Sequence, residues 1–197
     1  MSAYPAELAE DWDAPWDAGG EPLEIRPIRP EDAAAHDAFF HRLSPEDVRL
    51  RFFAAVRDLS PAMLARFTRL DYDRDMAFIA VRKRTRETVG VARLVREDDR
   101  SVGEFAVVVQ TDVKGHGLGL HLMQRLLDWA WAHGVPRVVG EILAWNTPML
   151  DLARHLGFHL RHIAGEPGVV EAVLDRPETA PTRDPRSVSD LPSAVAA

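Results

Sequence analysis

The sequence of 197 residues contains no cysteine and only two lysines, Lys83 and Lys114. Without cysteine the chain cannot form disulfide bonds, thiolate zinc sites or a cysteine nucleophile. No apolar run approaches the ~18 residues that a membrane-spanning helix requires, and the N-terminus lacks the basic and then apolar order of a signal peptide. No basic stripe is present, which argues against general nucleic-acid binding. We therefore expect a cytoplasmic protein that binds neither membrane nor nucleic acid.

The net charge of −7 is concentrated near the N-terminus. Residues 1–22 hold six acidic side chains and no lysine or arginine, whereas residues 23–175 carry a net charge of −1 and residues 176–197 are neutral. The first segment is expected to be a flexible acidic leader, or else a segment that docks Trp12 and Trp16 on the domain. Residues 23–175 have the size of one domain, and the proline-rich residues 176–197 are expected to be disordered.

Hydrophobic periodicity and helix-start signals predict the elements of residues 23–175. Ser44-Pro45 and Ser60-Pro61 combine a capping serine with proline at the first helical position, and Asp47 is expected to complete a capping box. Pro27 predicts an edge strand, because proline has no N–H for a ladder hydrogen bond. The predicted strands are 23–29, 76–81, 88–96, 102–110, 137–144, 158–163 and 169–174, and the predicted helices are 30–41, 44–53, 60–69, 118–133 and 147–156. This order predicts a mixed sheet of the α/β or α+β class, with helices on its faces.

The segment 105–119 carries the strongest chemical signal, because a strand, a short loop with glycines and an amphipathic helix follow one another. Glycine allows a tight turn and a close approach of a ligand, and the start of a helix offers unpaired N–H groups to a phosphate or pyrophosphate. The spacing fits neither a P-loop, since Lys114 precedes the glycines, nor a dinucleotide fingerprint, since the third glycine is missing. A tight turn that binds no ligand is the alternative.

The loop Lys114-Gly115-His116-Gly117-Leu118-Gly119 resembles the acyl-CoA pyrophosphate loop of the GNAT N-acetyltransferase superfamily, Arg/Gln-x-x-Gly-x-Gly/Ala, with lysine at the first position. Asn146 and Leu156-Gly157-Phe158 also match, and the element order agrees over residues 23–175. The sequence is most similar to the acetyltransferase domain of bacterial Pat-type protein lysine acetyltransferases. That similarity is carried by Arg49-Leu50-Arg51-Phe52-Phe53, Asp71-Tyr72-Asp73-Arg74-Asp75-Met76-Ala77, Gly103-Glu104-Phe105-Ala106-Val107 and Gly140-Glu141-Ile142-Leu143-Ala144.

The resemblance implies a mostly antiparallel sheet with a splayed parallel pair at its centre, and acetyl-CoA as the co-substrate. Backbone N–H groups of Val107, Val108 and Val109 would hold the pantetheine and polarise the thioester carbonyl. Asn146 would bond the pantetheine, or alternatively cap the following helix. The residues implied at the pyrophosphate are Lys114, Gly115, His116, Gly117, Leu118, Gly119 and Leu120.

Glu104 is the candidate general base, because the resemblance assigns that role to a glutamate at this motif position. A lysine acceptor is protonated at neutral pH and must lose a proton before it attacks. Strand alternation places Glu104 with Ala106 and Val108, and apolar surroundings would raise its proton affinity and suit it to this work. A solvated or ion-paired surface glutamate is the alternative. Ala153 stands where many superfamily members have a tyrosine acid, which leaves solvent to protonate the departing thiolate.

Further charged residues are weaker candidates. Glu141, in an otherwise apolar strand, is expected to bind the acceptor, to share the base role through water, or only to pair with an arginine. Asp73 and Asp75 lie in a loop that either meets a cationic lysine or simply turns the chain. No metal site is expected from His155, His159 and His162, because Gly157 ends the helix between the first two.

We therefore expect an N-acetyltransferase that moves an acetyl group from acetyl-CoA directly to the amine of a protein lysine. The resemblance implies an acceptor protein such as a CoA-ligase-type metabolic enzyme, and an oligomer is possible. Two alternatives are kept: a small-molecule amine acetyltransferase, and a non-catalytic acyl-CoA-binding regulatory domain.

Overall fold

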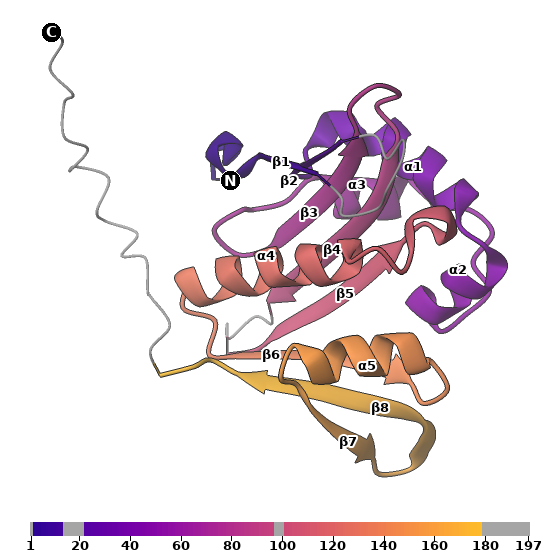
Figure 1. The fold of residues 1–197 in the computed structure, drawn as a ribbon, viewed down its shortest axis with the longest axis vertical. Helices are drawn as coiled ribbons and strands as arrows, with labels where there is room; N and C mark the ends of the chain where they lie inside the picture. Colours follow the sequence, from indigo (N-terminus) through magenta and orange to yellow (C-terminus); the bar gives the residue numbers. More distant parts are fainter. Residues whose placement is uncertain (1, 14–21, 97–100, 179–197) are drawn as a thin grey trace, which may run out of the picture.

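The computed structural model describes residues 2–13, 22–96 and 101–178, and its strands form one sheet in the order β1-β2-β3-β4-β5-β6-β8-β7 (Figure 1). Neighbouring strands are antiparallel except β5 and β6, which are parallel. The strands are β1 (Glu10–Trp12), β2 (Leu23–Pro27), β3 (Met76–Arg82), β4 (Thr88–Arg96), β5 (Gly103–Val109), β6 (Arg137–Leu143), β7 (His159–Ile163) and β8 (Glu166–Asp175). The predicted mixed, mostly antiparallel sheet is confirmed.

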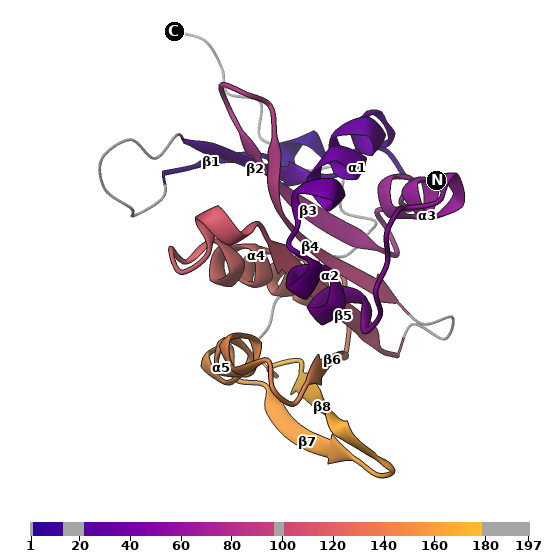
Figure 2. The same ribbon diagram turned by 90° about the vertical axis from the view of Figure 1, so that its right-hand side faces the viewer.

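Helices cover both faces of the sheet, as predicted (Figure 2). On one face lie α1 (Ala33–Arg42), α2 (Pro45–Phe52) and α3 (Pro61–Thr68), and on the other lie α4 (Leu118–Ala132) and α5 (Thr147–His155). Short 3-10 turns are η1 (Ala6–Leu8), η2 (Pro30–Asp32) and η3 (Thr111–Val113). Because helices pack on both sides, the first six residues of β3 are all buried, which is typical of a central strand.

The parallel pair at the centre of the sheet is splayed, as predicted. β5 and β6 share only two register positions, Gly103 with Val138 and Glu104 with Val139, and beyond them the strands diverge (Figure 1). Next to the point of contact, a Cβ on Gly140 would lie 2.4 Å from the Phe105 ring. Glycine at this position therefore leaves the space that the Phe105 ring fills against β6.

The N-terminus differs from the prediction. Residues 23–29 were expected to form the edge of the sheet, but β1 pairs with residues 23–25 and is itself the edge. Pro27 lies beyond the end of β1. Because Ile28 donates its N–H to Ala77 of β3, alternation turns the missing N–H of Pro27 to the side that β1 does not reach. Proline is therefore tolerated there without an edge position.

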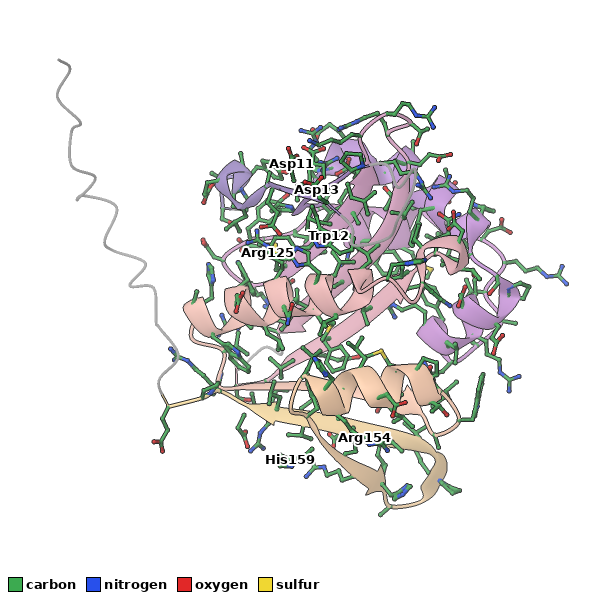
Figure 3. The ribbon with its side chains drawn as sticks, viewed as in Figure 1. Asp11, Trp12, Asp13, Arg125, Arg154 and His159 are labelled. Atoms are coloured by element: carbon green, nitrogen blue, oxygen red, sulfur yellow. The ribbon has the colours of Figure 1, made fainter. Side chains whose placement is uncertain are left out.

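Residues 2–13, hereafter the N-terminal segment, pack on the domain (Figure 3). The Trp12 ring stacks on His121 of α4 at 5.3 Å. Glu10 accepts a hydrogen bond from His121 at 2.7 Å and pairs with Arg125 at 3.3 Å, while Arg125 donates to the Leu8 carbonyl. Trp12 thus contacts the domain, as the alternative expectation for this segment had it. Residues 14–21, with Trp16, and residues 179–197 of the predicted tail lie outside the described residues.

Candidate active site

A cavity of about 430 Å³ opens where β5 and β6 diverge. Its lining residues come from β5, β6, α2, the loop before α4 and the start of α5. Two large apolar side chains at its rim, Phe53 and Trp145, are 42% and 48% exposed. A hollow of this size with apolar walls and a few charged groups is typical of a small-molecule site.

The open edge of β5 presents backbone donors to this cavity. Gln110 donates its N–H to Val89 of β4. Alternation along the strand then points the N–H of Val108 to β4 and those of Val107 and Val109 into the space that β6 has left. All three residues line the cavity. Of the three predicted backbone donors, however, only the N–H groups of Val107 and Val109 point into it.

The N-terminus of α4 supplies a second set of donors. Gly115 and Gly117 have φ of +78° and +86°, a conformation that glycine adopts without strain. No side chain caps α4, and the first intrahelical bond of the helix runs from His121 to Gly117. The N–H groups of Leu118, Gly119 and Leu120 thus lack helical partners and suit a phosphate.

The Lys114 ammonium pairs with the buried carboxylate of Asp47, for which the sequence predicted only a role in capping α2. The Ser44 hydroxyl accepts the N–H of Asp47 at 3.0 Å, as a helix cap should. The Asp47 carboxylate, only 4% exposed, interacts with the Ser44 side chain in return and also accepts from the Lys114 ammonium and from the Thr111 hydroxyl at 2.8 Å. Although burial opposes the charge, these bonds lower the pKa of Asp47.

Glu104 and Glu141 both line the cavity, at the end away from Lys114. Glu104 is exposed, so the burial among apolar side chains that was expected for it is absent. Its electrostatic neighbour is Arg51 of α2, a half-buried cation that also lines the cavity.

Burial, together with the carboxylates of Glu166, Glu104 and Glu171, raises the pKa of Glu141. No ion pair or hydrogen bond joins Glu141 to another described residue, so the alternative of pairing with an arginine finds no partner among them.

The remaining predicted residues fall into three groups. Asn146 lines the cavity, and its side chain caps α5 by accepting the Met149 N–H at 3.3 Å. Four residues of the loop and of the first turn of α4 do not line the cavity and could act there only through their backbone or from outside, namely His116, Gly117, Leu118 and Leu120. Asp73 and Asp75 lie away from the cavity: the backbone N–H of Asp73 donates to Ser2 and the Asp75 carboxylate accepts from the backbone of Arg96.

In residues 2–13, 22–96 and 101–178, no helix is long and apolar enough to cross a membrane. Within these same ranges no three histidine, aspartate or glutamate side chains gather in a way that could hold a metal ion.

Sequence reasoning missed Arg51, Phe53 and Trp145 as cavity residues, and it assigned Asp47 only a capping role. For Arg51 the sequence did contain one signal. Asp47 and Arg51 are four residues apart on α2, a spacing that places both side chains on one face of a helix. That face could have been recognised as charged, but which strand or loop it meets depends on tertiary packing.

Comparisons with known proteins agree with this geometry. A family model described as the acetyltransferase (GNAT) domain matches residues 23–159. The acetyltransferase PA5475 of Pseudomonas aeruginosa is 35% identical over 159 residues, which make up 80% of this chain and 85% of that protein. The L-methionine sulfoximine/L-methionine sulfone acetyltransferase of P. aeruginosa is 38% identical over 64 residues, 32% of this chain and 37% of that protein.

Among solved structures, the GNAT domain of S. lividans PAT is similar to this chain, with a TM-score of 0.78 and 26% sequence identity. The similarity covers 88% of this chain and 99% of that chain. Since the family model covers well over half of the sequence, the chain belongs to the GNAT acetyltransferase family, a class of enzymes that uses acetyl-CoA.

Proposed function

We propose that this enzyme transfers the acetyl group of acetyl-CoA to the side-chain amine of a protein lysine, with Glu104 as the general base. One observation carries the proposal: a single cavity joins the open edge of β5, the uncapped start of α4 and the Glu104 carboxylate. Acetyl transfer to an amine needs a thioester carbonyl held by N–H donors, a pyrophosphate site, and a base.

Acetyl-CoA is expected to lie along β5. The N–H groups of Val107 and Val109 would hold the pantetheine and the thioester oxygen, and the start of α4 would hold the pyrophosphate. Lys114 contributes there while still bonded to Asp47, since an ammonium has three N–H donors. The side-chain nitrogen of Asn146 is not used by the helix cap and remains as a donor toward the pantetheine.

In the reaction Glu104 takes a proton from the acceptor ammonium, directly or through one water. The neutral amine nitrogen then attacks the thioester carbon, the carbonyl oxygen becomes an oxyanion, and the N–H donors of β5 stabilise it. The C–S bond breaks as the carbonyl re-forms, CoA leaves as a thiolate, and the nitrogen loses its second ammonium proton to solvent, which leaves a neutral amide. Ala153, which stands at the position of the family's tyrosine acid, is fully buried, so solvent protonates the thiolate. Glu104, being exposed, returns its proton to solvent.

Two features support a protein as the acceptor. The rim of the cavity presents Phe53 and Trp145 to solvent, and exposed aromatic side chains are common where proteins dock. The similarity to the GNAT domain of S. lividans PAT extends over nearly the whole of that domain. A small-molecule amine is the second candidate, because a segment of 64 residues is 38% identical to an L-methionine sulfoximine/L-methionine sulfone acetyltransferase.

The test is incubation of the purified protein with acetyl-CoA and a panel of acceptors, followed by release of free thiol and by mass spectrometry of the products. The panel holds a CoA-ligase-type metabolic enzyme, other lysine-bearing proteins, and free amines and amino acids. We expect thiol release that depends on a protein acceptor, with acetyl groups on lysine side chains. Acetylation of free amino acids alone would overturn the protein acceptor, and acetyl-CoA binding without thiol release would overturn the transfer.

A further inference from the structure

One cation in the cavity has no role in the chemistry described above. Arg51, in the last turn of α2, lines the cavity beside Glu104 and also lines a small adjoining cavity of about 30 Å³. Its guanidinium lies 4.9 Å from the centroid of the Phe52 ring, and the residue as a whole is half-buried. A guanidinium has five N–H donors in a fixed planar arrangement, yet no described residue accepts a hydrogen bond from or forms an ion pair with Arg51.

The basic side chains near Arg51 either have hydrogen-bond partners or carry no charge. Arg93 donates to the backbone carbonyls of Arg66 and Phe67. Burial and the nearby arginines lower the pKa of His36 to about 4, so it carries no charge at neutral pH. Arg51 is therefore the cation of this group that faces the cavity, and burial disfavours its charge unless a negative group comes close.

The position of Arg51 along α2 determines whether it can contact the phosphates of acetyl-CoA or the acceptor. Asp47, one turn earlier, contacts Lys114 at the pyrophosphate end of the cavity, whereas Arg51 is coupled to Glu104 at the other end of β5. Glu104 and Val109 are five residues apart, or roughly 16 Å along a strand. The phosphates of acetyl-CoA at the start of α4 would thus lie away from Arg51, and the acceptor would lie near it.

We propose that Arg51 binds a carboxylate of the acceptor, so that the preferred acceptor carries a carboxylate close to the amine that is acetylated. This rests on the proposed function and narrows its substrate class. The guanidinium matches a carboxylate through two parallel hydrogen bonds, while Glu104 meets the ammonium. Either of two sources supplies this chemistry: an acidic side chain beside the lysine of a protein, or the α-carboxylate of a free amino acid.

The test compares matched acceptors. Blocked peptides differ only in glutamate or glutamine beside the lysine, and free amino acids are compared with their amides. Each acceptor is assayed with wild-type protein, with Arg51→Gln and with Arg57→Gln, which removes an exposed guanidinium outside both cavities. We expect the wild type to prefer the carboxylate-bearing member of a pair by about 10–100-fold in kcat/KM. Arg51→Gln should abolish this preference, and Arg57→Gln should retain it.

Three controls keep the outcomes distinct. Arg51→Gln should bind acetyl-CoA with wild-type affinity and unfold at the wild-type temperature, and Arg51→Lys should keep only part of the preference because it lacks the planar pair of donors. Preference among peptides identifies the side-chain source, and preference among amino acids identifies the α-carboxylate. Equal use of both members by the wild type, or an equal loss for both in Arg51→Gln, would overturn the proposal for Arg51. Failure of the wild type to acetylate any acceptor would instead contradict the proposed function, on which it rests.

Discussion

At the scale of single residues, His36 shows how the packing of α1 on the sheet sets the charge of a side chain. His36 lies between the rings of Phe39 and Phe67, and its Nδ1 has no hydrogen-bond partner among the described residues. Burial is the main reason for its low pKa, and the cations Arg93 and Arg51 add to the effect. The folded protein therefore holds His36 neutral at pH values where the unfolded chain would protonate it.

This difference predicts a stability that falls with acidification. Because the pKa of His36 drops from 6.5 to about 4 on folding, the unfolded state binds more protons between these values, and the free energy of unfolding decreases as pH falls through that window. From pH 7.5 to pH 5.0 the loss attributable to His36 is about 2 kcal/mol. Urea unfolding at the two pH values measures it, and His36→Gln should show a smaller loss. An identical loss in this variant would contradict the assignment to His36.

At the scale of elements, the packing of the parallel pair β5 and β6 depends on Gly140, which leaves space for the Phe105 ring. The Phe105 ring packs on Phe158 with centroids 5.0 Å apart and occupies the space above Gly140. Phe105 therefore fills the space between Gly140 and Phe158 while its own strand diverges from β6. The cavity depends on this arrangement, since β5 diverges from β6 directly after residue 104.

We predict that Gly140→Ala destabilises the protein by about 1–3 kcal/mol, because the added methyl group would overlap a packed ring. Gly168→Ala is the matched control: it adds the same atom to the neighbouring strand, where nothing lies within 4 Å. Thermal or urea unfolding compares the two variants. If both have the same stability, the Phe105 ring has room to move and the close packing is not essential.

The contact between α2 and the loop before α4 is the second prediction at this scale. Lys114→Met leaves the buried Asp47 carboxylate with the Thr111 hydroxyl but without its cation, and we expect a loss of about 1–3 kcal/mol in the free energy of unfolding. Asp47→Asn should also destabilise, and the double variant should lose less than the two single losses together. Unfolding of the four proteins in urea gives the coupling energy. Strictly additive losses would show that the two side chains do not stabilise each other.

Local patterns in the sequence predicted those elements whose signals are local. The apolar run of β3, the serine-proline starts of α2 and α3 and the four-residue periodicity of α4 all have the expected character. Asp47 and Lys114 are 67 residues apart, and nothing in the local sequence indicates their contact. Likewise β1 consists of Glu10-Asp11-Trp12, which has no strand periodicity and forms only because β2 and α4 offer partners.

At the scale of the whole molecule, the N-terminal segment ties one edge of the sheet to the helix whose start forms the candidate pyrophosphate site. Tyr4 donates to the Pro27 carbonyl at 3.1 Å, and the Asp11 carboxylate pairs with Lys83 at 2.5 Å. Glu10 bridges His121 and Arg125 of α4. The acidic residues of this segment are thus used in part to pair with the domain, where Asp11 and Trp12 lie beside Arg125 (Figure 3). None of residues 2–13 lines the cavity.

We predict that deletion of residues 1–13 lowers the free energy of unfolding by at least about 2 kcal/mol, or Tm by about 4–8 °C, because the segment buries apolar surface on β2 and α4. Glu10→Gln should cost about 0.5–1 kcal/mol, and Glu7→Gln, an exposed carboxylate of η1, should cost nothing measurable. Differential scanning calorimetry compares the variants. An unchanged Tm in the deletion variant would mean that the segment only rests on the surface.

The proposed acetyl transfer depends on Glu104 as its general base. The most direct test is the turnover of Glu104→Gln with an acceptor that the wild type acetylates, alongside the control Glu31→Gln, an exposed carboxylate that does not line the cavity. We predict that Glu104→Gln lowers kcat at least ~100-fold, within the usual contribution of a general base, while Tm and the affinity for acetyl-CoA stay at wild-type values. Near-normal turnover by this variant, with folding unchanged, would contradict the account.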